Sequence, residues 1–354
     1  MWIQTYKKLF GILTFCVILI ALPQVFAQPV EPKQPLEVDV YQGAELLKKV
    51  RHKYSHYKVS KGRAGWVDLN FMISADGEPY EIEVVDHSHG GDTFVNAARK
   101  AVSRYEYRPA MLGDQAVESS DSIRLRFDRV RSSYSSPSFR RVSKELYDSL
   151  ENKDQEESLK LLRLLEKSRN MNLSNDAYLN YINYMYQADY GTEALQLYYL
   201  HRAVFDPQQE IYFGEDSYLE LLSMLFVLKA NHNYFYDAKK IYSRLAQKDN
   251  TDEVLAKFKP TIDQIDKLIK TNSLVNTQGE INDLNGWNIG LVNKSFSFEQ
   301  IEGQIDELKL RCSQKYVFIE FFADKVYQMP DSYGQCRLTA IGSPGTKFIL
   351  AQGG

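Results

Sequence analysis

Few residues of this chain are spaced in a way that could perform chemistry on their own. The densest group is the run Asp86-His87-Ser88-His89-Gly90-Gly91-Asp92, which places two imidazoles beside two carboxylates. Side chains of these types bind transition metals. Consecutive loop residues rarely hold a metal without ligands from elsewhere, and no second set is evident in the sequence. A plain connecting loop is therefore the preferred interpretation, and no metal is expected.

Catalytic motifs are absent as well. The sequence has no Gly-x-Ser-x-Gly elbow, no His-Glu-x-x-His pair, no phosphate-binding loop and no dinucleotide fingerprint. We predict a protein with no catalytic residues and no cofactor, and not an enzyme. The formal net charge of -3 gives no electrostatic reason to expect nucleic acid as a partner. No small-molecule substrate is indicated either, which leaves other proteins as the expected partners.

The elements that would position such residues are best defined between residues 37 and 130. Residues 65–73 and 122–128 alternate apolar and polar side chains, which predicts half-buried strands. Asp76-Gly77 predicts a tight hairpin turn into a return strand over residues 80–85. Apolar residues spaced three and four apart over residues 94–105 predict an amphipathic helix. We also expect a helix near residues 44–54, so the predicted order is helix, strand, strand, helix, strand.

This segment resembles the C-terminal domain of the TonB family, the energy transducers of Gram-negative bacteria. The most specific stretch is Arg104-Tyr105-Glu106-Tyr107-Arg108-Pro109, which follows a helix and precedes the last strand. The other residues that carry the resemblance are Tyr54, Gly65-Trp66-Val67, Phe71, Asp76-Gly77, Val84-Val85, Phe94, Ala97-Ala98, Val102, Ala110, Gly113 and Phe127. The resemblance implies a domain that adds an extended segment of a partner protein to its sheet as an extra strand.

The resemblance places the partner-binding site on the last strand. An added strand needs an exposed edge with free N–H and C=O groups, and residues 122–128 are the natural candidate. The predicted partner-binding residues are Tyr54, Ser122, Ile123, Arg124, Leu125, Arg126 and Phe127. An open edge of this kind also permits strand exchange between two copies, so a homodimer is an alternative.

Arginines recur along the same strand and its continuation, at Arg124, Arg126, Arg129 and Arg131. One interpretation is a solvated strand face whose charge blocks aggregation at the edge. The other is an edge that pairs with a partner strand. The sequence leaves both open.

Residues 138–272 are strongly helical in pattern and resemble tetratricopeptide repeats. The small residues Ser158, Ala194 and Ala238 are each followed four positions later by a large one. In such repeats small residues let paired helices approach. The alternative is an irregular helical bundle. Aromatic residues are frequent in this part and belong either to the helical core or to a peptide groove; they are Tyr178, Tyr181, Tyr184, Tyr186, Tyr198 and Tyr199.

Residues 280–352 return to strand patterns and predict a small β domain. Strands are expected at 286–291, 316–322, 326–327 and 348–350, while residues 301–311 fit either a strand pair or a short helix. Cys312 and Cys336 lie in this segment. Two cysteines in an exported chain indicate a disulfide, worth roughly 3 kcal/mol for a loop of this length. Two free buried thiols are the alternative.

The N-terminus has the features of an export signal. Lys7 and Lys8 precede an apolar run over residues 9–22, and Val25-Phe26-Ala27 fits a cleavage site before Gln28. A spanning helix needs roughly 20 apolar residues, so a retained inner-membrane anchor facing the periplasm is the second choice. A Pro-rich lead over residues 28–36 follows. We expect a periplasmic protein.

Taken together, the sequence predicts an α+β protein with three regions after the signal: a TonB-like α/β domain (37–130), tetratricopeptide-like helices (138–272) and a β domain (280–352). The resemblance implies a role accessory to energy-coupled uptake across the outer membrane. The partner would be an outer-membrane receptor segment or a component of the inner-membrane transport complex. The alternative is a periplasmic scaffold for envelope assembly, because helical repeats present extended binding surfaces.

Overall fold

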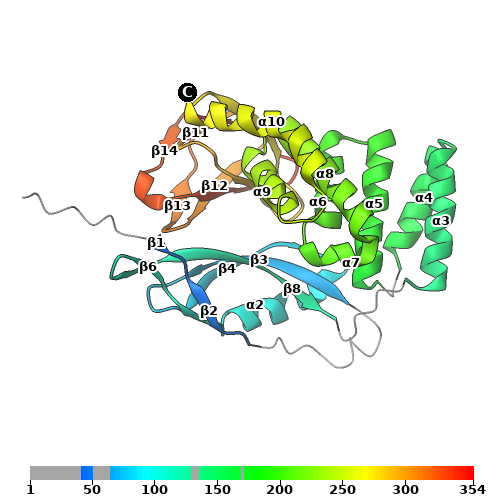
Figure 1. Ribbon diagram of the computed structural model, residues 1–354, viewed down its shortest axis with the longest axis horizontal. Coiled ribbons are helices and arrows are strands. Elements are labelled where there is room, and N and C mark those ends of the chain that lie inside the picture. Colours follow the sequence, from blue (N-terminus) through cyan, green and yellow to red (C-terminus); the bar gives the residue numbers. More distant parts are fainter. Residues whose placement is uncertain (1–40, 51–63, 129–134, 169–170) are drawn as a thin grey trace, which may run out of the picture. The chain divides into compact units, whose positions relative to one another are not determined.

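The computed structural model of the chain describes residues 41–50, 64–128, 135–168 and 171–354. The predicted signal (1–27), the Pro-rich lead (28–36) and Tyr54 lie outside these ranges. Residues 39–354 form one compact unit. Along this unit an N-terminal region of strands with one short α-helix is followed by a helical region and then by a region of strands (Figure 1).

The N-terminal region is built on a three-stranded antiparallel sheet with the order β4-β3-β8. The turn between β3 and β4 requires glycine, because Gly77 has a φ of 84° and an added Cβ would lie 2.0 Å from the Tyr107 carbonyl oxygen. The predicted hairpin is therefore confirmed. The elements of this region are β1 (Tyr41–Gln42), β2 (Glu45–Lys48), β3 (Gly65–Ile73), β4 (Pro79–His87), η1 (Gly91–Phe94), α2 (Val95–Val102), β5 (Glu106–Arg108), β6 (Ala110–Leu112), β7 (Gln115–Val117) and β8 (Ser119–Phe127).

One prediction for this region is wrong. Residues 45–48 form strand β2, not the start of a helix, and β2 pairs antiparallel with β5. Leu46 and Leu47 of this strand are exposed at 39% and 57%. Hydrogen bonds offered by the edge of β5 outweigh the weak local preference, since tertiary context overrides helix propensity.

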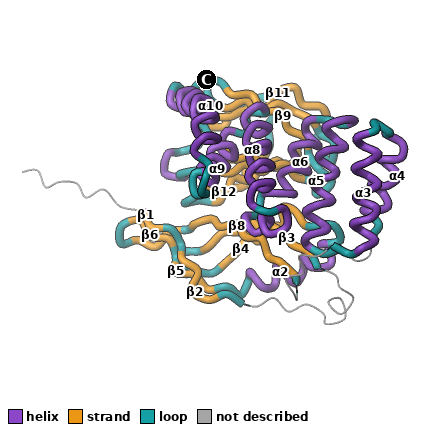
Figure 2. Tube along the Cα trace, turned by 45° about the vertical axis from the view of Figure 1, so that its right-hand side comes forward, coloured by secondary structure: helices purple, strands orange, loops and turns teal. Residues whose placement is uncertain are grey.

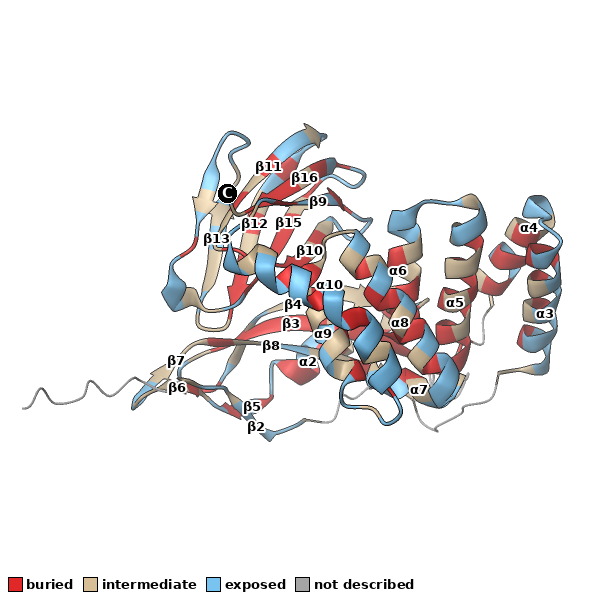
Figure 3. Cartoon of the chain, turned by 45° about the horizontal axis from the view of Figure 1, so that its top comes forward, coloured by how far each residue is buried: buried red, intermediate tan, exposed pale blue. Residues whose placement is uncertain are grey.

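Strand β3 is buried on both of its faces, as its colour shows in Figure 3. Its odd-numbered side chains pack with α2 in one hydrophobic core; from β3 these are Val67, Leu69, Phe71 and Ile73. Its even-numbered residues Trp66, Asn70 and Met72 are also buried, on the opposite face. The alternation that predicted a half-buried strand therefore belongs to a strand with two covered faces.

The helical region forms three contacting pairs, α3 with α4, α5 with α6, and α8 with α9. Side-chain caps fix where several helices begin; Asp154, for example, accepts a hydrogen bond from the Glu157 N–H at the start of α4. Figure 2 shows these helices in purple, with α3 and α4 at the right-hand end. The bounds are α3 (Pro137–Glu151), α4 (Gln155–Glu166), α5 (Leu173–Tyr190), α6 (Glu193–Val204), η2 (Pro207–Gln209), α7 (Glu210–Phe213), α8 (Glu215–Asn231), α9 (Phe235–Leu245) and α10 (Asp252–Lys270).

The three small residues of the predicted repeats all lie on the second helix of a pair. Ser158 and Ala238 are fully buried, where they allow close helix approach, but Ala194 is exposed on α6. The likeness to tetratricopeptide repeats remains a prediction. The aromatic residues are divided: Tyr186 is buried in the core, whereas Tyr198 is 39% exposed beside the Arg202 guanidinium.

The C-terminal β region consists of two four-stranded antiparallel sheets, β10-β15-β12-β13 and β14-β11-β16-β9. Cys312 of β12 and Cys336 of β15 face each other in the ladder and form the predicted disulfide. Residues 301–311 form the end of β11 and most of β12, so they are strands rather than a helix, but the two strands lie in different sheets and do not form the predicted pair. Strands β9 and β15 were not predicted. The bounds are β9 (Val275–Glu280), β10 (Gly286–Gly290), β11 (Ser295–Glu302), β12 (Ile305–Cys312), β13 (Tyr316–Glu320), β14 (Val326–Gln328), η3 (Asp331–Tyr333), β15 (Cys336–Gly342) and β16 (Lys347–Gln352).

Candidate partner-binding edge

The predicted partner-binding strand lies at an edge of its sheet. Strand β8 pairs with β3 along its whole length, from Phe127 opposite Gly65 to Ser119 opposite Ile73. Among the described residues no strand pairs with the other side of β8. Six of the seven predicted residues, 122–127, are thus consecutive positions on one edge strand. The seventh, Tyr54, lies outside the described residues.

The contacts at the start of β3 show which backbone groups of β8 point outward. The Trp66 N–H donates to Ser88 Oγ at 2.9 Å, and the Trp66 carbonyl accepts from the Ser88 N–H at 3.0 Å, so the Trp66 backbone faces the β4 side. Backbone direction alternates along a strand, so odd-numbered residues of β3 and their partners on β8 bond to each other. The even-numbered residues of β8 therefore turn their N–H and C=O groups away from the sheet. The Ser122 N–H is consistent with this outward direction, because it donates to Asp121 Oδ1 at 2.7 Å and not to β3.

Two of the predicted residues are structural rather than available to a partner. Leu125 and Phe127 are 1% and 0% exposed and lie in the core beneath α2. The Phe127 ring stacks on Phe94 with centroids 4.6 Å apart. These side chains hold β8 against the rest of the sheet. On this face a partner strand could meet Asp121, which is exposed, and Ile123, which is half-buried.

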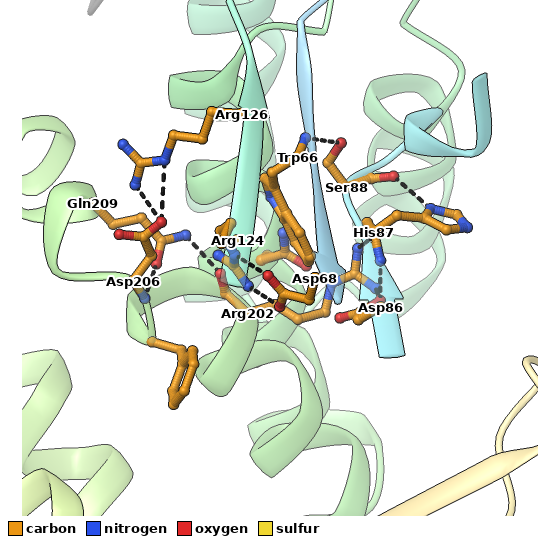
Figure 4. Close-up of polar contacts among 12 residues, drawn as sticks. Trp66, Asp68, Asp86, His87, Ser88, Arg124, Arg126, Arg202, Asp206 and Gln209 are labelled. Carbon is orange, nitrogen blue, oxygen red and sulfur yellow. Dashed lines mark hydrogen bonds and ion pairs between the residues drawn. The ribbon is translucent and has the colours of Figure 1, made fainter. Parts of the chain in front are cut away.

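Arg124 extends from the opposite face and is almost enclosed, with 9% of its side chain exposed. Its guanidinium lies 3.6 Å from the centre of the Trp66 ring and donates two hydrogen bonds of 2.6 Å to Asp68 (Figure 4). Burial alone would lower the pKa of Arg124, but the charge of Asp68 outweighs it and the pKa lies above its ordinary value. The solvated-face interpretation of this arginine is wrong, because the helical region covers it.

Arg126 links the end of β8 to the helical region. Its guanidinium pairs with Asp206 at 2.5 Å and contacts Gln208. Asp206 caps η2 through the Gln208 N–H, so the same carboxylate organises η2 and anchors the strand. In Figure 4 the Arg126 side chain points away from Trp66 toward Asp206. At the other end of β8, Glu118 pairs with Lys315 at 3.5 Å. The C-terminal end of the edge is therefore held firmly, whereas the exposed Glu118–Lys315 pair contributes little at the other end.

A second set of contacts fixes the sheet to α5 and α6. Arg202 pairs with Asp86 at 3.1 Å and donates to the His87 carbonyl at 2.6 Å. The Trp66 indole N–H donates to Asp176 at 2.8 Å, and Asp176 also accepts from the His89 N–H at 2.9 Å. Burial raises the pKa of Asp86, although the charge of Arg202 opposes the rise.

The loop that suggested a metal site is thus engaged in contacts with the helical region. Asp86 and the backbone of His87 and His89 bind Arg202 and Asp176. Within the described ranges no group of three or more His, Cys, Asp or Glu side chains is arranged to hold a metal ion.

Sequence reasoning missed Asp176 and Arg202, which carry this interface. The available signal was weak: Ser174, Asn175 and Asp176 open α5 as a polar run, yet all three are buried. A buried polar run at a helix start indicates a partner that supplies hydrogen bonds, but it does not identify the partner.

Comparison with known proteins supports the interpretation of the N-terminal region as TonB-like. No curated protein matches the chain. None of the helices among the described residues is both long and apolar enough to cross a membrane. Residues 50–128 match the family model of the Gram-negative bacterial TonB protein C-terminal. That family consists of non-enzymatic protein-interaction domains of periplasmic, envelope-associated proteins, which interact with proteins such as outer-membrane receptors. The resemblance carried by these residues is therefore confirmed, and the N-terminal region is similar to a TonB C-terminal domain.

Proposed function

We propose that this chain is a periplasmic interaction protein that binds an extended segment of a partner by adding it to the outer edge of β8. The partner is an outer-membrane receptor segment or a component of the transport complex, and the role is accessory to energy-coupled uptake. The observation that carries the proposal is the row of outward-facing backbone groups at Ser120, Ser122 and Arg124. These are the groups that strand addition requires.

The contacts that fix the C-terminal half of β8 favour binding. Association costs free energy when a flexible binding segment must first be ordered. Here Arg124 is fixed by Asp68 and Trp66, and Arg126 is fixed by Asp206. The edge is thus preorganised, and less of the interaction free energy is lost on ordering it. Tyr54 remains a predicted side-chain contact of the partner.

The test is a binding titration of residues 28–354 with fluorescent peptides that copy periplasmic N-terminal segments of outer-membrane receptors. Ser122→Pro removes an outward N–H, and proline is tolerated at an edge where that group faces solvent. We expect this variant to weaken binding about tenfold or more, equivalent to about 1.4 kcal/mol.

Ser122→Ala is the matched control, because both substitutions remove the Ser122 Oγ hydrogen bond to Asn70, which is 2.7 Å long. Only the proline variant loses the N–H. Proline at Ile123 or Leu125 would instead remove a ladder bond to β3 and test folding. Equal binding by Ser122→Pro and Ser122→Ala would rule out the β8 edge. Failure of the wild-type chain to bind any receptor peptide would favour a scaffold role for the helical region.

A further inference from the structure

The other edge of the same sheet borders a cleft that the proposed function does not use. Strand β4 is the second edge strand in the order β4-β3-β8. A cavity of about 200 Å³ lies beside Glu83, Val84 and Val85 of this strand. Residues from β10 and β15 line it opposite β4, and Arg99 of α2 contributes as well.

The backbone of Val84 faces this cleft. Asn70 has the same orientation as Trp66, so its N–H and C=O bond to its partner Glu83 on β4. Val84 is paired with Leu69, whose backbone faces β8, so the Val84 N–H and C=O point away from β3. The ladder shifts register between Asp68 and Leu69, which places Val85 in a bulge. The edge is therefore irregular but open at Val84.

The opposite wall offers partners suited to a peptide backbone. Asn288 and Thr339 face each other across β10 and β15 and are joined by a hydrogen bond of 2.5 Å between Thr339 Oγ1 and Asn288 Oδ1. The amide N–H groups of Asn288 form no hydrogen bond with described residues. Ile341 adds an apolar surface beside them. The open edge of β4, the Asn288 amide and the apolar Ile341 surface together suit an extended peptide whose side chains alternate in direction.

The charge of the cleft favours an acidic ligand. Glu83 is neutralised by Lys309 at 2.5 Å and Arg311 at 2.9 Å. Arg99 is exposed and makes no ion pair with any described residue, and the same is true of Lys100 and Arg104 at the same end of α2. Basic residues at a helix C-terminus also stabilise the helix dipole, but that does not neutralise them. Asp283 lies in the neighbouring turn and carries a negative charge that disfavours an acidic ligand, but it does not line the cleft.

The size of the cleft argues for a peptide over a small molecule. Sites for small organic ligands usually measure about 300–1,000 Å³, and this cavity is smaller. It can enclose a side chain or two of an extended segment that is held at the Val84 backbone.

We propose that the outer edge of β4 and the adjoining cleft bind an extended acidic peptide segment of a partner protein, as a second strand-addition site separate from β8. The Val84 backbone groups hold the segment, Arg99 pairs with one of its carboxylates, and Asn288 and Ile341 contact its side chains. Two opposite edges would then let one sheet hold two segments at once.

The test uses residues 28–354 and a labelled peptide of alternating valine and glutamate, with the valine–lysine peptide as its charge-reversed counterpart. Fluorescence anisotropy should show binding of the glutamate peptide at least tenfold tighter than that of the lysine peptide. Gly286→Leu fills the cleft without backbone strain, because a Cβ at Gly286 meets only Thr339 Cγ2 at 3.9 Å. It should weaken binding at least tenfold. Gly43→Leu is the control, since an added Cβ there meets nothing within 4 Å.

Arg99→Glu should also weaken binding of the glutamate peptide about tenfold, whereas Arg163→Glu, an equal charge change on exposed α4, should not. Val84→Pro should weaken it further than Val84→Ala. Ser122→Pro should leave it unchanged, so this proposal and the β8 proposal fail separately. The second site is overturned if the wild-type chain does not bind the glutamate peptide, or if Gly286→Leu and Arg99→Glu bind it as tightly as their controls.

Discussion

The two faces of β3 are both buried but by different chemistry. On the α2 side Val67, Leu69 and Phe71 are essentially without exposed surface in an apolar core. On the other side the Trp66 indole N–H donates to the Asp176 carboxylate, Asp68 accepts from the Arg124 guanidinium, and Asn70 accepts from the Ser122 hydroxyl. One nine-residue strand therefore carries a hydrophobic core and a hydrogen-bonded interface on alternating residues.

The difference separates stability from positioning. Apolar burial is non-directional and grows with the area removed from water, so the α2 face can stabilise the sheet in many detailed arrangements. Hydrogen bonds require defined distances and angles. The polar face therefore fixes how the sheet meets α5, α6 and η2, and it leaves β8 held at Arg124 and Arg126. Substitutions on the two faces should therefore differ in how much unfolding free energy they remove and in how that loss depends on pH.

The largest effect is expected on the apolar face. Phe71→Ala removes a ring with no exposed surface whose centroid lies 6.0 Å from that of Tyr107. Phenylalanine-to-alanine changes in a core cost about 3–5 kcal/mol of unfolding free energy. Urea denaturation followed by circular dichroism measures the loss. If the cost were below about 1 kcal/mol, the apolar face would not be the main support of the N-terminal region.

A somewhat smaller loss is expected from Arg202→Met on the polar face. The substitution keeps an apolar stem but leaves Asp86 buried without its partner, and breaking a buried ion pair in this way costs about 3 kcal/mol. Because burial raises the pKa of Asp86, its neutral form is favoured as the pH falls. The loss measured by denaturation should therefore be greater at neutral pH than in acid.

The double variant Arg202→Met with Asp86→Leu distinguishes positioning from stability. Replacing both members of a buried pair by apolar groups is often close to neutral. We expect the double variant to recover much of the unfolding free energy lost by Arg202→Met. If the double variant were no more stable than the single one, the cost would come from the Arg202 hydrogen bond to the His87 carbonyl rather than from the pair.

The two faces also differ in how far the sequence predicted them. Alternation over residues 65–73 and the spacing of Phe94, Ala98 and Val102 identified the apolar face, because its members are close in sequence and share one property. The polar face joins Trp66 to Asp176 and Asp86 to Arg202, which are 110 and 116 residues apart. Sequence patterns encode periodicity within an element. They do not show which buried polar group bonds to which. For this reason the sequence allowed Arg124 to be interpreted as part of a solvent-exposed strand face.

The sequence likewise predicted only part of the candidate site. The last strand and its edge position followed from the TonB-like pattern. The direction of each N–H did not, because it depends on the register of β3 with both neighbours. That register selects Ser122 and Val84 as test positions in preference to Ile123 and Leu125. The β2 strand was missed for a related reason, since only its pairing with β5 makes residues 45–48 extended.

The smallest effect we predict is a pH dependence at the contact between β4 and β12. Burial raises the pKa of Glu83, but hydrogen bonds and charge from Lys309 and Arg311 outweigh it and leave the pKa below its ordinary value of 4.5. A carboxyl with a lowered folded-state pKa stabilises the fold above its unfolded-state pKa, and this stabilisation is lost as the pH falls through the folded-state value. The difference in Tm between the wild-type chain and Glu83→Gln should therefore shrink in acid, starting below about pH 4.5.

The effect should be modest, because the Glu83 side chain is 26% exposed and water weakens its ion pairs. Glu78→Gln is the control, since Glu78 is exposed beside the same strand and its side chain has no partner among the described residues. Its Tm should follow the wild-type value at every pH. A wild-type advantage over Glu83→Gln that persisted unchanged in acid would mean that the shape of the side chain, and not its charge, holds β4 to β12. The contact would then resemble the apolar face of β3 more than the polar one.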